Sequence, residues 1–453
     1  MLGYSIEDII RITGGTLVPA DYSGECKLNE LVMDSRTVKK DDIFVALTGG
    51  ATDGHKYIPA AFELGAGCCL AEHIEAPQAG PVILVKDTLL AMQQIAAEFR
   101  SSLDIPVIGI TGSVGKTTAK EMIASVLSRK YRVLKNEGNY NNHMGVPITL
   151  SRIIPGYHEI AVVEMGISGF GEMTVLAKMA RPDAALFTVI GHAHLEFLHD
   201  LDGVLKAKTE MLDYLQDGAP VIINGDDPYL RKIVSSHRII TFGFDKNNDI
   251  YADNINDSGT ENVECDIHVG NECFHAVIPG FGRHLVNAAL EGTACGYAMG
   301  LKPEEIIEGI SGYATVGRRF SVLTKGDFTF IDDCYNANPD SVKSSLETFS
   351  ALKGRKIFIF GEMRELGENS GEMHKDIGSF AAEKGIDILL CSGENVRCAA
   401  DAFGGKGIWY PDREKLIEAL PGILKDDDNV LIKASLGSKY AEISEFIKKY
   451  MKL

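Results

Sequence analysis

Short runs of β-branched and apolar residues alternate with longer amphipathic segments along almost the whole chain. The clearest predicted strand covers Pro106–Thr111 and runs through a glycine turn into a helix expected from about Thr117 to Lys130. Further buried strands are predicted at residues 160–164, 184–190, 221–224, 356–360, 387–391 and 430–433. Because strands that alternate with helices usually form parallel sheets, the pattern predicts an α/β protein.

Two seams in this pattern predict three domains. One seam lies near residue 85, before a helix expected at Leu89–Phe99, and the other lies near residue 315, in a short loop flanked by glycines. A chain of 453 residues also agrees with about three domains of ordinary size. The segment Asp245–Asn271, rich in Asn, Asp and Gly, is expected to add a β-meander to the middle domain. The expected domains are residues 1–85, 86–314 and 315–453.

The charge balance restricts the possible partners. There are 45 Lys and Arg residues against 63 Asp and Glu residues, which gives a formal charge of −18. An acidic surface repels nucleic acid and anionic lipid unless a basic patch overrides it, and no run of Lys or Arg is longer than about a pair. We therefore expect no nucleic-acid partner, and anionic ligands would need Mg²⁺ or a few well-placed cations.

The cysteines and the N-terminus predict the compartment. The nine cysteines are an odd number and show no C-x-x-C spacing, which indicates free thiols in a reducing environment. The first eight residues lack the basic start and apolar core of a signal peptide. No apolar stretch approaches the ~18 residues that a membrane span needs. We expect a cytoplasmic protein without a membrane span.

A glycine-rich loop between the first clear strand and its helix predicts phosphate binding. Glycines allow backbone N–H groups to face phosphate oxygens, the lysine neutralises charge, and the following threonine can bind Mg²⁺. The strict pattern has a glycine where this chain has Ile110, so the loop is a shorter variant; the alternative is a structural glycine turn. The loop residues are Thr111, Gly112, Ser113, Val114, Gly115, Lys116 and Thr117.

Three polar groups follow the next strands. Glu164 ends a predicted strand, where a carboxylate commonly holds Mg²⁺, although it could be a helix cap or a surface residue. His194 lies in a His-rich segment that allows a metal ligand, a zinc site with His192 and His199, or a hydrogen-bonded loop histidine. Lys208, on a predicted helix, carries no functional signal by itself.

Taken together, these motifs resemble the Mur ligase family of ATP-dependent amide ligases. The family shares the shortened phosphate loop, a Glu at the position of Glu164, and a His at the position of His194. A lysine that is carbamylated in the family matches Lys208. The resemblance implies that Lys116, Glu164, His194 and Lys208 are catalytic, and that Thr117, Glu164, His194 and Lys208 hold Mg²⁺. It adds Asn287, Arg318 and Asp333 to the residues that bind ATP.

Other segments are similar to one branch of the family. Asp332–Pro339, Gly138–Pro147 and Gly361–Gly367 match the branch that joins D-alanyl-D-alanine to UDP-N-acetylmuramoyl-tripeptide through an acyl phosphate. The resemblance implies a UDP-binding N-terminal domain with Ser35 and Arg36. It also implies a central ATP-binding domain and a Rossmann-like C-terminal domain in which Asn336 and Asn338 bind the dipeptide. A monomer is expected.

Alternative functions stay open at this point. A sister ligase would add the third residue of the peptide instead, a phosphate-loop kinase would transfer phosphate and stop, and a binding module would hold ATP with little turnover. The sequence leaves undecided whether the third peptide residue of the substrate is lysine or a diamino acid, and whether Lys208 is carbamylated.

Overall fold

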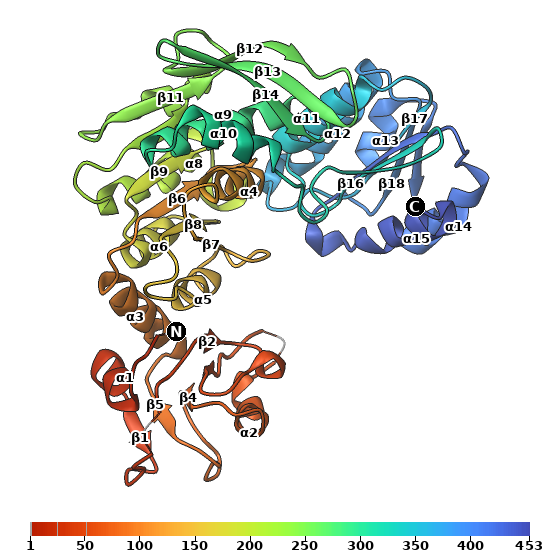
Figure 1. The fold of residues 1–453 in the computed structure, drawn as a ribbon. Coiled ribbons are helices and arrows are strands. Elements are labelled where there is room, and N and C mark those ends of the chain that lie inside the picture. Colours follow the sequence, from red (N-terminus) through yellow and green to blue (C-terminus); the bar gives the residue numbers. More distant parts are fainter. Residues whose placement is uncertain (1, 25, 51) are drawn as a thin grey trace.

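The computed structural model describes residues 2–24, 26–50 and 52–453, and these residues form three sheets of five, nine and six strands. Each sheet is built from one stretch of the chain, and helices cover it (Figure 1). The strands are mostly parallel, which confirms the predicted α/β class. Among the described residues, no helix is both long and apolar enough to cross a bilayer.

The N-terminal sheet has the strand order β1-β5-β4-β3-β2, with β1 antiparallel to β5 and the other pairs parallel. Its strands are only two to four residues long. The elements are α1 (Ile6–Thr13), β1 (Thr16–Val18), β2 (Leu31–Val32), η1 (Ser35–Thr37), β3 (Ile43–Val45), η2 (Gly54–Tyr57), α2 (Ile58–Glu63), β4 (Cys68–Ala71) and β5 (Val82–Leu84).

Helix α3 (Thr88–Ser101) joins this sheet to the central one, close to the range predicted for it. Its Ile95 and Phe99 belong to one continuous apolar core, which contains Leu70 of the N-terminal sheet and Val163 of the central sheet. The two parts therefore share a core across the seam near residue 85.

The central sheet has the order β14-β13-β12-β11-β10-β9-β6-β8-β7. It is parallel from β7 to β12, and β12 to β14 are antiparallel. The meander predicted for residues 245–271 contains β12 and β13, and β14 follows it. Its strands are β6 (Val107–Thr111), β7 (Val133–Lys135), β8 (Ile160–Glu164), β9 (Ala184–Phe187), β10 (Val221–Asn224), β11 (Ile239–Gly243), β12 (Ile250–Asn256), β13 (Asn262–Val269) and β14 (Glu272–Pro279). Its helices are α4 (Lys116–Leu127), α5 (Gly145–Ser151), α6 (Glu172–Ala180), α7 (Leu195–Leu198), α8 (Leu201–Thr209), η3 (Glu210–Tyr214), η4 (Leu230–Lys232), α9 (His284–Ala298) and α10 (Pro303–Ser311).

Strand β9 ends at Phe187, three residues before the predicted end. The following segment bends over the phosphate loop instead of extending the sheet. There, Ser113 N donates to the backbone oxygen of Val189 at 2.8 Å, and the Ser113 hydroxyl donates to the backbone oxygen of Gly191 at 3.0 Å. The apolar residues after Phe187 thus hold the loop in place.

The C-terminal sheet has the order β15-β16-β20-β17-β18-β19, with only the β15–β16 pair antiparallel. Its elements are β15 (Ser321–Lys325), β16 (Phe328–Asp333), α11 (Pro339–Ser350), β17 (Lys356–Phe360), η5 (Gly367–Asn369), α12 (Ser370–Glu383), β18 (Ile388–Ser392), α13 (Arg397–Phe403), β19 (Gly407–Tyr410), α14 (Arg413–Ala419), η6 (Leu420–Gly422), β20 (Asn429–Lys433), η7 (Leu436–Ser438) and α15 (Ala441–Met451). Polar contacts, such as that between Asn338 Nδ2 and the backbone oxygen of Ser113 at 3.4 Å, join it to the central part.

Candidate active site

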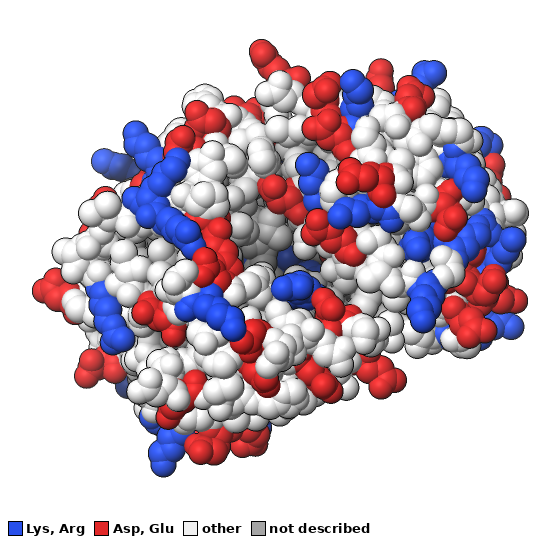
Figure 2. Space-filling view, turned by 90° about the horizontal axis from the view of Figure 1, so that it is seen from above, with Lys and Arg blue, Asp and Glu red and all other residues white. Residues whose placement is uncertain are grey.

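A cavity of about 560 Å³ lies where the central and C-terminal parts meet. Viewed from above, the molecule is hollowed at its centre, with charged side chains of both signs around the hollow (Figure 2). The cavity brings together many residues that the sequence analysis singled out. These are Ser113, Val114, Gly115, Lys116, Thr117, Glu164, His194, Asn287, Asp333, Asn336 and Asn338.

The phosphate loop has the conformation that its glycines allow. Gly112 has φ +151°, and a Cβ atom there would lie 1.9 Å from Thr188 Oγ1, so no larger residue fits. Gly115 has φ +87° and is the N-cap of α4. Lys116 Nζ donates to the backbone oxygen of Gly112 at 2.7 Å, and burial lowers the pKa of this lysine. The loop thus curls around its own lysine at the N-terminal end of a helix, a geometry that suits phosphate.

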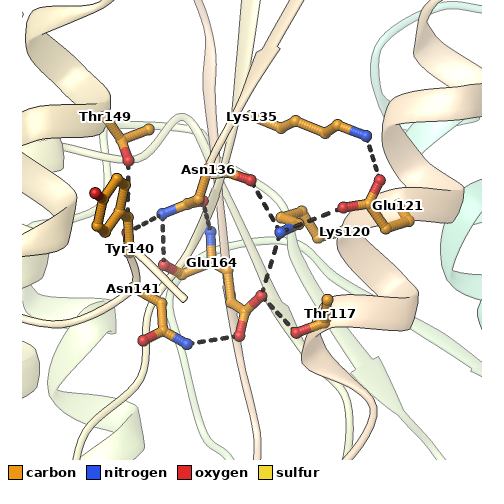
Figure 3. Close-up of polar contacts among 9 residues, drawn as sticks. All are labelled: Thr117, Lys120, Glu121, Lys135, Asn136, Tyr140, Asn141, Thr149 and Glu164. Carbon is orange, nitrogen blue, oxygen red and sulfur yellow. Dashed lines mark hydrogen bonds and ion pairs between the residues drawn. The ribbon is translucent and has the colours of Figure 1, made fainter. Parts of the chain in front are cut away.

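Glu164 is held from three sides at the end of β8 (Figure 3). Thr117 Oγ1 donates to Glu164 Oε2 at 2.8 Å, and Asn141 Nδ2 donates to Oε1 at 2.7 Å. The backbone N–H of Glu164 donates to Asn136 Oδ1 at 2.6 Å. Because both carboxylate oxygens have partners and the residue is 2% exposed, the carboxylate has one fixed orientation. Its oxygens and the Thr117 hydroxyl are the donor types that Mg²⁺ prefers.

Lys120 is a buried cation that the sequence analysis missed. It is 1% exposed, and its Nζ lies 3.7 Å from Glu164 Oε2 and 3.3 Å from Glu121 Oε1. The same ammonium donates to the backbone oxygen of Asn136 at 3.0 Å. Glu121 also pairs with Lys135, so positive and negative charges alternate from the surface to Glu164 (Figure 3).

His194 is the N-cap residue of α7 and has φ +57°. Its Nδ1 pairs with a carboxylate oxygen of Glu365, which belongs to the C-terminal part. This bond lowers the pKa of Glu365. His192 pairs similarly with Asp340 at 3.1 Å. Among the described residues, His192, His194 and His199 do not form a metal-binding cluster, so this geometry gives the zinc alternative no support. Instead, the two paired histidines connect the central part to the C-terminal part.

Lys208 lies on α8 and is 1% exposed. Burial, followed by the charge of Lys116, holds the pKa of Lys208 well below its usual range. Within the described part of the chain, no residue gives its ammonium a hydrogen bond or an ion pair. A buried lysine of this kind favours the neutral amine, and the neutral amine is the form that reacts with carbon dioxide.

The C-terminal part contributes Asp333 and a different arginine from the one expected. Asp333 Oδ2 accepts from Lys433 Nζ at 2.5 Å and from Ser345 Oγ at 2.7 Å. Arg318 is turned away from the cavity, because its guanidinium pairs with Glu445 at 2.8 Å and also faces Asp332. Its neighbour Arg319 lines the cavity. In this structure Arg319 lines the cavity and Arg318 does not, so the ATP-binding role expected of Arg318 stays a prediction.

The N-terminal candidates lie outside this cavity. Ser35 and Arg36 form η1, and the Arg36 guanidinium is 87% exposed and pairs with Asp34 at 2.6 Å. The structure therefore places them on a separate surface from the phosphate loop.

Helix α9 completes the cavity wall with polar side chains. His284 lines the cavity, and burial lowers its pKa to about 4. Asn287 Oδ1 is buried without a hydrogen-bond partner. Glu291 is 4% exposed, and burial raises its pKa well above the usual value. Of these three, sequence reasoning singled out only Asn287.

Three family models match the chain in order. They are the Mur ligase family catalytic domain at residues 27–100, the Mur ligase middle domain at 110–296, and the Mur ligase glutamate ligase domain at 318–436. A curated relative from Bacillus subtilis is 34% identical over 98% of both chains. The chain belongs to the Mur ligase family.

One curated relative and two solved structures are similar to this chain over nearly its whole length. The Bacillus subtilis relative is named UDP-N-acetylmuramoyl-tripeptide–D-alanyl-D-alanine ligase. A MurF structure from Acinetobacter baumannii superposes with a TM-score of 0.90 and 27% identity over 99% of both chains. A MurF ligase from Thermotoga maritima in complex with ADP gives a TM-score of 0.83 at 28% identity and covers 94% of this chain and 98% of that one. The similarity thus spans all three sheets of this Mur ligase.

Proposed function

We propose that this Mur ligase joins D-alanyl-D-alanine to UDP-N-acetylmuramoyl-tripeptide and converts ATP to ADP and phosphate. The observation that carries the proposal is the full-length similarity to relatives of this name. The cavity supports it, because a phosphate loop, a fixed carboxylate and a buried lysine meet there with residues of the C-terminal part. It would act in the cytoplasm as a monomer. We also propose that the chain divides into three domains, with boundaries near residues 85 and 315.

Mg²⁺ fits the oxygen donors at the end of β8. Thr117 and Glu164 would hold one ion, and His194 with a carbamate on Lys208 would hold a second. Burial favours the neutral amine of Lys208, which is the form that carbon dioxide can convert into a carbamate. The carbamate is an anionic oxygen ligand, and a bound Mg²⁺ would offset its charge. When bound, the ions would neutralise phosphate charge and polarise the γ-phosphate.

The reaction would proceed in two steps in which this chain orients the groups. A carboxylate oxygen of the tripeptide attacks the γ-phosphorus of ATP, the bond to ADP breaks, and an acyl phosphate forms. The dipeptide amine then attacks the acyl carbon, loses a proton and releases phosphate as the amide forms. Lys116 and Arg319 offset the negative charge that gathers as these anions approach one another.

Asn336 and Asn338, which follow β16, would have different roles. Asn338 caps α11, because its Oδ1 accepts from the backbone N–H of Ser341 at 2.8 Å while its amide reaches Ser113. Asn336 lines the cavity, and no described residue holds its side chain. Asn336 would therefore contact the dipeptide, and Asn338 would place the loop. Ser35 and Arg36 would bind the uridine diphosphate part at the N-terminal surface.

Product analysis tests the proposal. We expect mass spectrometry to find the pentapeptide nucleotide when ATP, Mg²⁺, tripeptide nucleotide and dipeptide are all present. A phosphorylated substrate that persists as the final product would favour a kinase. A product formed only from the dipeptide nucleotide and a diamino acid would favour the sister ligase.

A further inference from the structure

His194 and Glu365 meet between the central and C-terminal parts, and both have a left-handed backbone. Their φ angles are +57° and +61°, in a region that residues other than glycine rarely occupy. His194 Nδ1 pairs with Glu365 Oε2, and the backbone N–H of Glu196 donates to the backbone oxygen of Glu365 at 3.3 Å. Because the Glu365 side chain is 44% exposed, this pair adds little to stability. Strained backbone on both sides of such a contact indicates a functional role for it.

The loop that carries Glu365 is fixed by the C-terminal part. It belongs to the segment Gly361–Gly367, which the sequence analysis singled out without assigning it a role. The backbone N–H of Met363 donates to Nε2 of His374 at 2.9 Å. His374 is fully buried, and its other ring nitrogen donates to a backbone oxygen at 2.7 Å. The carboxylate of Glu365 therefore reaches His194 from a firm support.

The pair determines which nitrogen of His194 is free. A carboxylate only accepts hydrogen bonds, so a neutral His194 ring carries its proton on Nδ1 when it pairs with Glu365. The lone pair of Nε2 is then available, and no described residue forms a hydrogen bond with this atom. His194 also lines the cavity. Histidines that bind metals typically have this arrangement, in which a carboxylate holds the other ring nitrogen and sets the orientation of the ring.

We infer that Glu365 is a positioning residue that holds the His194 ring with an unprotonated Nε2 as a ligand for the second Mg²⁺. This inference rests on the proposed function, because it takes His194 as a ligand of that ion. Glu365 acts through the histidine and needs no contact with the ion or the substrates. The second metal site, whose ligands His194 and Lys208 lie in the central part, thus depends on a residue of the C-terminal part.

Binding of Mn²⁺ in place of Mg²⁺ tests the inference without turnover. Electron paramagnetic resonance counts the bound ions in the presence of β,γ-methylene-ATP, whose γ-phosphate cannot be transferred. We expect Glu365→Ala to bind the second ion about tenfold to a hundredfold more weakly than the wild type, the usual cost of losing the carboxylate partner of a metal-binding histidine. Unchanged affinity in Glu365→Ala, or a wild type that binds no second ion, would overturn the inference.

Asp340→Ala is the matched control for docking of the C-terminal part. Asp340 is another carboxylate of that part, and it pairs at 3.1 Å with His192, two positions before His194. Its removal weakens the same boundary but leaves the partner of His194 in place. This variant should bind the second ion about as tightly as the wild type. Equal weakening in Asp340→Ala and Glu365→Ala would mean that docking alone governs the affinity, and would overturn the inference.

A double-mutant cycle separates action through His194 from any other effect of Glu365. His194→Ala lacks the ring that Glu365 holds, so adding Glu365→Ala to it should cause no further loss of Mn²⁺ affinity. A further loss as large as that in the wild-type background would overturn the inference.

Electron spin-echo spectra of protein labelled with ¹⁵N-histidine check the metal ligand itself. Bound Mn²⁺ should couple to a histidine nitrogen in the wild type and not in His194→Ala, and no such coupling in the wild type would overturn the inference. Failure of the wild type to form the pentapeptide nucleotide would instead overturn the proposed function. A wild type that forms it, while Glu365→Ala binds Mn²⁺ normally, would overturn only the role of Glu365.

Discussion

Replacing Lys120 with methionine tests whether the buried charges around Glu164 are organised as described. The substitution keeps the length of the side chain and removes its charge. Lys120 Nζ lies 3.3 Å from Glu121 and 3.7 Å from Glu164, and the residue is 1% exposed. At an effective dielectric constant of about 20, these separations correspond to gross attractions of about 5 and about 4.5 kcal/mol. Desolvation offsets much of this attraction in the intact network.

Removal of the cation leaves two buried carboxylates, and Glu164 loses its nearest charge partner. Breaking a buried pair in this way typically costs about 3 to 5 kcal/mol. Scanning calorimetry of Lys120→Met should therefore show a melting temperature at least roughly 6 °C below that of the wild type.

Lys135→Met is the matched control. It removes the same charge from the same partner, Glu121, at a side chain that is 41% exposed. An exposed pair contributes about 1 kcal/mol or less, so this variant should lose no more than roughly 4 °C. If the two variants melt within a degree or two of each other, burial does not govern the network and the reasoning is refuted.

Three further predictions follow from single sites. Gly112→Ala should abolish nucleotide binding, because the new Cβ would lie 1.9 Å from Thr188 Oγ1. The control Gly371→Ala has open space around its Cβ and should bind the nucleotide normally. Normal binding by both variants would contradict the loop geometry. Depleting carbon dioxide should lower ligase activity and bicarbonate should restore it, since Lys208 favours a neutral amine; activity that is indifferent to bicarbonate would count against the carbamate. The pKa of His284 is about 4 when folded and about 6.5 when unfolded. The contribution of His284 to the free energy of unfolding should therefore be constant above pH 7 and fall by up to about 3 kcal/mol between pH 6.5 and 4. His284→Asn should flatten that slope, and an equal slope in urea titrations would disprove the assignment.

Local patterns predicted the central and C-terminal sheets well because long buried strands leave a clear signal. Predicted strands at residues 160–164 and 356–360 match β8 and β17. The N-terminal strands are two to four residues long, which is too short for periodicity to identify. The end of β9 was placed too late, because the residues after Phe187 pack against the phosphate loop through backbone contacts that composition does not reveal.

The candidate site also contains residues that the sequence predicted and residues that it did not. The phosphate loop and Glu164 carry their signals in consecutive residues, so sequence reasoning found them. Lys120 was missed because a lysine on a helix is ordinarily solvated, and only packing shows that it is buried. Its spacing of four residues from Lys116, on the same helix face, was the available signal. Arg318 and Arg319 are adjacent, and only the path of the backbone decides which one enters the cavity.

Release of phosphate from ATP tests the central claim most directly. The assay uses the wild-type protein, Mg²⁺ and UDP-N-acetylmuramoyl-tripeptide, with and without D-alanyl-D-alanine. The account predicts sustained phosphate release only when both the tripeptide nucleotide and the dipeptide are present. Release that is equally fast without the dipeptide, or no release when both are present, would contradict it.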